Sequence, residues 1–140
     1  MYEYRVENIR VIDGDTVDVD IDLGFDVWMK KQRIRLHNID TPESRTKDKV
    51  EKTFGLASKK RLEEILSMSD DIILRSVQDA RGKFGRILGD FVIDDLSGTC
   101  GDLLCAEGYA VRYTGQNKKE IQEEHLKNRE RLIQEGKVVL

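Results

Sequence analysis

The residues best suited to chemistry lie in and just after one strand-like stretch, RIRLHNIDTPE at positions 33–43. Alternation with a period of two puts the aliphatic side chains on one face and leaves Arg35 on the other, where its guanidinium stays accessible. Pro42 cannot donate to a strand ladder, so the strand must end near Asp40. An arginine matches phosphate oxygens, whereas a carboxylate pair such as Asp40 and Glu43 suits an oxygen-binding cation or general-base work. Together they suggest phosphodiester chemistry.

The same stretch has a simpler interpretation that its residues alone do not exclude. Arg35 could form an ordinary salt bridge with Asp40 or Glu43 at a solvated edge. His37 shares the strand face of Arg35, and we expect it to be a rim or packing residue, because an oxygen-rich cation site does not need an imidazole.

A second acidic turn, DGDT at 13–16, precedes this stretch. Asp-Gly between apolar runs is typical of a hairpin turn, and apolar residues alternate with aspartates over 17–23 as in a half-buried strand. A third strand over 27–35 completes a meander, in which Asp15 and Asp40 can converge at one rim. Carboxylates that close would repel each other without a cation.

The rest of the chain predicts three helices and two further strands. We expect a helix over 49–66, strands over 72–74 and 87–93, a short helix over 103–107, and a last helix over 119–134. Gly101 should cap the short helix and Gly108 should end it, and His125 on the last helix is expected to be structural. Five strands with one helix after the third match an OB-fold. We therefore predict one mainly β (α+β) domain over 1–140, a five-stranded OB-fold barrel with about three helices.

Composition limits the class of protein. The 140 residues carry a net charge of −3 and 36% charged side chains, which favours a soluble globular domain and argues mildly against a general nucleic-acid coat protein. Cys100 and Cys105 are expected to be free, buried thiols. Residues 1–7 lack the apolar run of an export signal, and no long apolar stretch could span a bilayer. We expect a cytoplasmic monomer without a membrane partner, as would suit a protein encoded on a mobile element or phage.

Four segments together resemble the staphylococcal nuclease (thermonuclease) family over nearly the whole chain. VIDGDT at 11–16 resembles its first motif, and positions 35–43 resemble its R-x(4)-D-T-P-E motif. KFGR at 83–86 resembles its K-Y-G-R loop, and GYA at 108–110 resembles its G-x-A step. The motifs agree in order and spacing, which makes the resemblance specific. It implies the same fold and nuclease activity.

The resemblance also implies a calcium site and a residue that acts on water. Ca²⁺ would be bound by the carboxylates of Asp15 and Asp40 and by the Thr41 carbonyl, a donor set that suits a hard cation. Glu43 would orient or deprotonate the attacking water. Whether this glutamate is a true general base stays open on chemical grounds.

Phosphate and base contacts are implied at four further positions. Arg35 and Arg86 would hold the phosphate and neutralise its growing charge. Lys83 would contact a terminal phosphate and Tyr113 would stack near a base, although a solvated loop lysine and a surface tyrosine remain alternatives. Phe84 replaces the family's usual tyrosine, so a hydroxyl contact to substrate should be missing.

The function expected from this resemblance is a calcium-dependent nuclease acting on DNA and RNA and leaving 3′-phosphate products. The alternative is a catalytically weak or inactive OB-fold module that binds single-stranded nucleic acid. A protein-interaction module has no positive support in the sequence.

Overall fold

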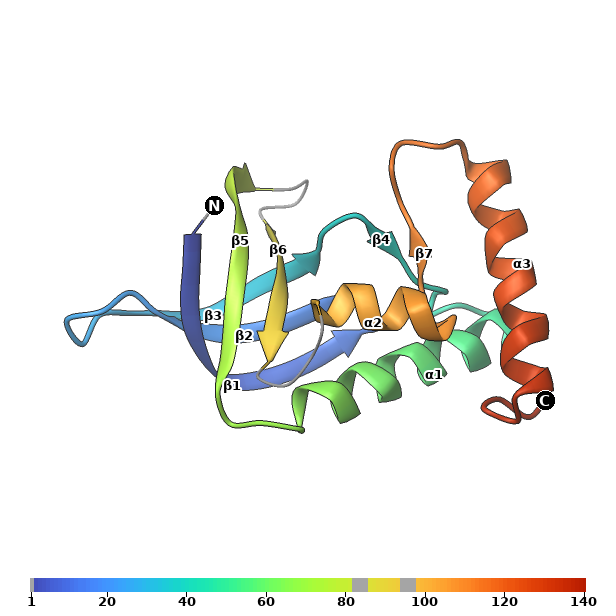
Figure 1. The fold of residues 1–140 in the computed structure, drawn as a ribbon, viewed down its shortest axis with the longest axis horizontal. Coiled ribbons are helices and arrows are strands. Elements are labelled where there is room, and N and C mark those ends of the chain that lie inside the picture. Colours follow the sequence, from blue (N-terminus) through green and yellow to red (C-terminus); the bar gives the residue numbers. More distant parts are fainter. Residues whose placement is uncertain (1, 82–85, 94–97) are drawn as a thin grey trace.

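The chain forms a closed five-stranded barrel with helices packed against it (Figure 1). The computed structural model describes residues 2–81, 86–93 and 98–140. The barrel strands are β1 (Tyr2–Asp13), β2 (Thr16–Asp22), β3 (Trp28–Leu36), β5 (Ile72–Arg81) and β6 (Ile87–Ile93). The other elements are β4 (Ile39–Asp40), α1 (Lys49–Leu66), α2 (Cys100–Glu107), β7 (Val111–Arg112) and α3 (Lys118–Gln134).

The strand order confirms the predicted OB-fold. Around the barrel the order is β1-β2-β3-β6-β5, and β1 closes the barrel by antiparallel pairing with β5. The first three strands form the expected antiparallel meander, whereas β3 and β6 run parallel. Thr16 pairs with Arg35, and the Leu36 N–H donates to the Asp15 carbonyl at 2.8 Å. The register therefore brings the first acidic turn beside the arginine of β3.

The predicted alternation along β2 fails at one residue. Asp18 and Asp22 are partly exposed, but Asp20 is buried, with 8% of its surface accessible. A register shift between Val19 and Ile21 in the pairing with β3 breaks the regular alternation at this position. Asp20 is satisfied there by the Asn8 amide and the Lys31 backbone N–H, each at 2.8 Å.

One apolar core fills the barrel and continues beneath α1 and α2. Helix α1 has the predicted bounds, and Asp48 caps its first turn by accepting from the N–H groups of Val50 and Glu51. The largest side chains of the core include Val17, Ile34, Leu36, Phe54, Leu62, Ile65, Leu74, Phe91 and Leu104. The barrel rim and α1 thus form one packed unit on which the polar corner is built.

The short helix α2 begins earlier than predicted, and its cap is a different residue. Thr99, not Gly101, is the N-cap, and it forms a capping box with Asp102. A threonine hydroxyl can accept from the helix N–H groups, which glycine cannot do. Gly108 ends the helix in the left-handed conformation, as expected.

Two short strands and one thiol also differ from expectation. β4 pairs with β7, which joins Asp40 to Val111 in a small second sheet that the sequence did not indicate. Cys100 is buried as expected, but Cys105 is only partly buried. Among the helices that the structure describes, none combines the length and the apolar character needed to cross a membrane.

Candidate active site

The candidate site is centred on the guanidinium of Arg35, near the end of β3. Its Nη1 donates to the Leu36 carbonyl at 2.6 Å and its Nη2 donates to the Ile39 carbonyl at 3.0 Å. The same Nη2 lies 3.3 Å from Asp15 Oδ2 and 3.8 Å from Asp40 Oδ1. The two backbone contacts hold the group in place, and the two carboxylates share it.

Arg35 changes the electrostatics expected at this corner. The repulsion between Asp15 and Asp40 is offset, because a permanent positive charge lies between them. Asp15 Oδ2 and Asp40 Oδ1 are close to each other, because each lies within 4 Å of the same nitrogen atom. Asp15 uses its other oxygen to accept from the Thr16 hydroxyl at 3.0 Å. Both carboxylates therefore stand near a common point at the barrel rim.

The donor set fits a hard cation but is incomplete by itself. Both side chains offer carboxylate oxygens, which Ca²⁺ prefers. Across residues 2–81, 86–93 and 98–140, no three or more His, Cys, Asp or Glu side chains are grouped so as to hold a metal ion. A cation held by Asp15 and Asp40 would therefore need additional oxygens from the backbone, water or substrate.

Asp40 has a second partner that sequence reasoning did not identify. His125 Nε2, on α3, lies 2.8 Å from Asp40 Oδ2. An ionised carboxylate only accepts hydrogen bonds, so Nε2 carries the hydrogen in this contact. The periodicity of α3 indicated that His125 faces inward, and it is 7% exposed, but nothing in the sequence indicated a partner 85 positions away.

The turn that follows Asp40 is held against the barrel and α1. Thr41 is buried, and the Ser44 hydroxyl hydrogen-bonds the Asp13 carboxylate. Gly55 of α1 lies under the Glu43 backbone so closely that a Cβ on it would stand 2.3 Å from the Glu43 carbonyl oxygen. The Glu43 side chain is exposed. A fixed backbone thus carries an accessible carboxylate.

Two clefts meet at Tyr113, whose backbone N–H donates to the Asn38 carbonyl at 2.8 Å. One cleft, of about 360 Å³, is lined by Asp40, Thr41, Glu43, Tyr113 and His125 among others. The other, of about 420 Å³, is lined by Arg35, Arg86 and Tyr113 among others. Tyr113 thus lines both the cleft that contains Asp40 and Glu43 and the cleft that contains Arg35 and Arg86.

Two predicted substrate-binding residues, Lys83 and Phe84, lie outside the residues that the structure describes. Tyr113 is 46% exposed, which leaves its ring accessible. Gly115, two residues further on, has φ of +93°. A larger side chain there would be strained, so this backbone conformation favours glycine.

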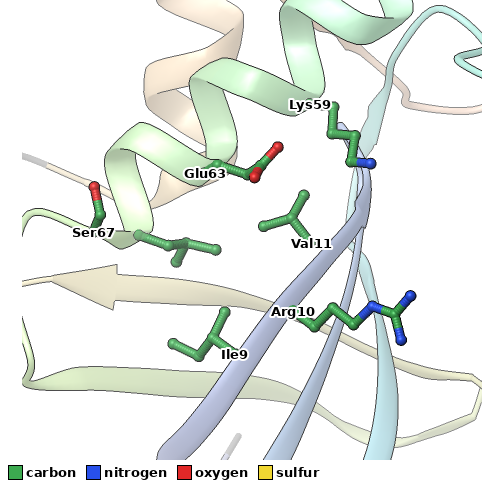
Figure 2. A pocket seen from close by; sticks show the side chains of 7 residues that line it. Ile9, Arg10, Val11, Lys59, Glu63 and Ser67 are labelled. Carbon is green, nitrogen blue, oxygen red and sulfur yellow. The ribbon is translucent and has the colours of Figure 1, made fainter.

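A further groove lies between β1 and α1, and Figure 2 shows Arg10 and Lys59 toward one end and Ser67 at the other. Its remaining lining includes Ile9, Val11 and Glu63. None of the predicted site residues that the structure describes lines it. The two clefts that Tyr113 lines contain most of the predicted site residues and are therefore the candidate site.

The site thus combines an OB-fold barrel with an arginine that two carboxylates share at the barrel rim. The staphylococcal nuclease homologue family matches residues 33–140, and the chain belongs to that family. The chain is also 28% identical over 116 residues to Endonuclease YhcR of Bacillus subtilis (strain 168). That match covers 79% of this chain and 9% of the relative, so the chain spans only a small part of the relative's length.

Proposed function

We propose that the protein is a calcium-dependent nuclease that hydrolyses phosphodiester bonds of DNA and RNA and leaves 3′-phosphate ends. The observation that carries the proposal is the position of Arg35, whose Nη2 lies within 4 Å of both Asp15 and Asp40. Family membership and the endonuclease relative support the reaction class. The polarity of cleavage is inferred from the family resemblance alone.

The arginines would bind and neutralise the scissile phosphate. Arg35 has five N–H donors; the contacts to Leu36 and Ile39 use two of them, and Nη2 also faces Asp15 and Asp40, which leaves donors on Nη1 and Nε for a phosphate. Arg86 lines the same cleft. Two guanidinium groups facing one cleft can contact different oxygens of a phosphate, and such contacts strengthen as negative charge develops on those oxygens.

The carboxylates would divide between cation binding and water activation. Asp15, Asp40 and the Thr41 carbonyl would hold Ca²⁺, whose positive charge would help to stabilise the phosphate. Glu43 lines the cleft on the Asp40 side and is exposed, so a water molecule can reach it. It would orient that water or accept its proton.

Tyr113 would favour substrates with unpaired bases. Tyr113 is exposed and lines both clefts, and any base can stack on an aromatic ring without sequence readout. In a duplex the bases are already stacked on each other. We therefore expect denatured DNA and single-stranded RNA to be cleaved faster than duplex DNA.

The proposal is tested by incubating the protein with end-labelled single-stranded DNA or RNA in CaCl₂, in MgCl₂ or in excess chelator. We expect cleavage with Ca²⁺, poor cleavage with Mg²⁺, which demands a more regular shell of ligands, and none with chelator. Fragments should change mobility after removal of a 3′-phosphate. Asp40→Asn, purified in the same way, controls for contaminating nucleases. Undiminished cleavage in chelator would refute the calcium dependence, and binding without cleavage would favour a single-strand-binding OB-fold module.

A further inference from the structure

We infer that His125 is a positioning residue of the cation site, so that helix α3 is part of that site. The inference rests on the proposed function, because it requires Asp40 to be a cation ligand. His125 Nε2 lies 2.8 Å from Asp40 Oδ2, and the histidine side chain is 9% exposed. A buried donor at this distance restrains the carboxylate directly.

The two carboxylate oxygens of Asp40 have different neighbours. Oδ1 lies on the side of Arg35, 3.8 Å from its Nη2, whereas Oδ2 accepts from His125. The Asp40 side chain is 36% exposed, and the terminal torsion of an aspartate is broad, so a carboxylate without the second contact could rotate. His125 therefore fixes the direction in which Oδ1 is offered to the common point beside Asp15.

Helix α3 is docked firmly enough to present His125 in one position. One turn further along, Asn128 Nδ2 donates to the Ala110 carbonyl at 3.2 Å. Arg131 Nη2 donates to the Ala106 carbonyl at 2.8 Å, and Leu132 is buried. These contacts join α3 to the α2–β7 segment, and β7 is the strand that pairs with β4 and Asp40. Figure 1 shows α3 on the side of the molecule where β4 and β7 lie.

A purely structural His125 would do something different. It would stabilise the docking of α3, and its loss would lower the thermal midpoint without changing how the folded protein binds a cation. A positioning residue changes the cation affinity of protein that is still folded. Losing the hydrogen-bonding partner of a metal ligand costs about 10–100-fold in metal affinity. Calcium affinity, measured on folded protein, therefore distinguishes the two roles.

The experiment is a calorimetric CaCl₂ titration of the wild-type protein and three variants of α3. His125→Leu removes the donor and keeps an apolar group of similar size. His125→Gln restores a donor, because its amide nitrogen is as many bonds from Cβ as Nε2 is. Gln122→Leu, one turn earlier and lining the same cleft, is the matched control. Circular dichroism confirms that each variant is folded at the titration temperature.

We expect His125→Leu to weaken Ca²⁺ binding by about 10–100-fold. His125→Gln should recover most of the affinity, and Gln122→Leu should match the wild type. Equal affinity in His125→Leu and the wild type, or no recovery in His125→Gln, would overturn the positioning role. If His125→Leu does not fold, His125→Gln is compared with Gln122→Leu instead. A loss of about 10–100-fold in the Ca²⁺ affinity of His125→Gln, the loss expected for His125→Leu, would then overturn the positioning role of His125.

Asp40→Asn separates this inference from the proposed function. If the wild type binds Ca²⁺ and Asp40→Asn does not, the cation site stands and the His125 variants test the inference alone. If Asp40→Asn binds Ca²⁺ as tightly as the wild type, or the wild type binds none, the proposed site is wrong and the inference falls with it.

Discussion

Replacing Gly55 by alanine should separate the geometry of the site from the stability of the fold. A Cβ at this position would stand 2.3 Å from the Glu43 carbonyl oxygen, 2.5 Å from its carbon and 2.7 Å from the Ser44 nitrogen. All three neighbours are backbone atoms, so no side-chain rotation can relieve the contact. Restoring an ordinary carbon–oxygen separation requires α1 and the Glu43 turn to move apart by about 1 Å.

The expected effect on stability is small because two contributions oppose each other. Overpacking costs roughly 1–3 kcal/mol. Alanine is a better helix former than glycine by about 1 kcal/mol, and this gain applies in the middle of α1. The net loss of roughly 0–2 kcal/mol should leave a domain of ordinary stability folded. A displacement of 1 Å, however, can lower a reaction rate by about 100-fold.

The measurements are thermal unfolding and the calcium-dependent cleavage rate of single-stranded DNA. Leu66→Ala is the control, because Leu66 is buried at the C-terminal end of α1 and its truncation destabilises the core without touching the Glu43 turn. We expect Gly55→Ala to lose about 100-fold in rate, and Leu66→Ala to keep its rate at temperatures where it is folded. A Gly55→Ala protein that cleaves at the wild-type rate would refute the reasoning that the turn must stay in place.

Three further predictions concern other groups of the chain. Arg35→Lys should lower the cleavage rate by about 10²–10³-fold in a steady-state assay, because one ammonium cannot serve two carbonyls and a phosphate together; a near wild-type rate would reduce Arg35 to a surface charge. The hydrogen bond from Arg112 lowers the pKa of Asp102 in the folded protein. The ionised Asp102 carboxylate therefore stabilises the fold fully above its unfolded pKa of about 3.9, and this stabilisation is lost as the pH falls through the lower folded pKa. Asp102→Asn should therefore cost roughly 0.5–1 kcal/mol in urea unfolding at neutral pH, since the pair is half-exposed, and the difference from wild type should shrink in acid; an unchanged difference at low pH would contradict this. Burial raises the pKa of the Cys100 thiol, so iodoacetamide at mildly alkaline pH should modify the more exposed Cys105 first, as peptide mass spectrometry would show; equal labelling would contradict the burial of Cys100.

Local patterns in the sequence predicted the elements that follow from short-range rules. The barrel meander follows from alternation and hairpin turns, and α1 has the bounds that its apolar periodicity predicted. The pairing of β2 with β3 also brings Asp15 beside Arg35, a contact that was not predicted although the register of adjacent strands determines it. These features depend on neighbours in the chain or in an adjacent strand.

The features that were missed depend on an irregular strand register or on close packing between different elements. The burial of Asp20 comes from an irregular register with β3, and alternation alone cannot predict such a shift. Gly55 stands in a helix, where glycine is costly, and this was a usable signal for close packing. Nothing in the sequence indicated that His125 contacts Asp40, because two residues 85 positions apart show no periodic pattern.

The long-range contacts explain why the acidic corner needs the C-terminal third of the chain. Asp40 belongs to a strand of two residues, which is too short to hold its own backbone in place. Pairing with β7 supplies that support, and α3 adds the hydrogen bond from His125. Arg35 and Asp15, by contrast, lie on and beside barrel strands with many ladder partners. The position of the second carboxylate therefore depends on α3 and β7, whereas the first carboxylate and the arginine depend on the barrel.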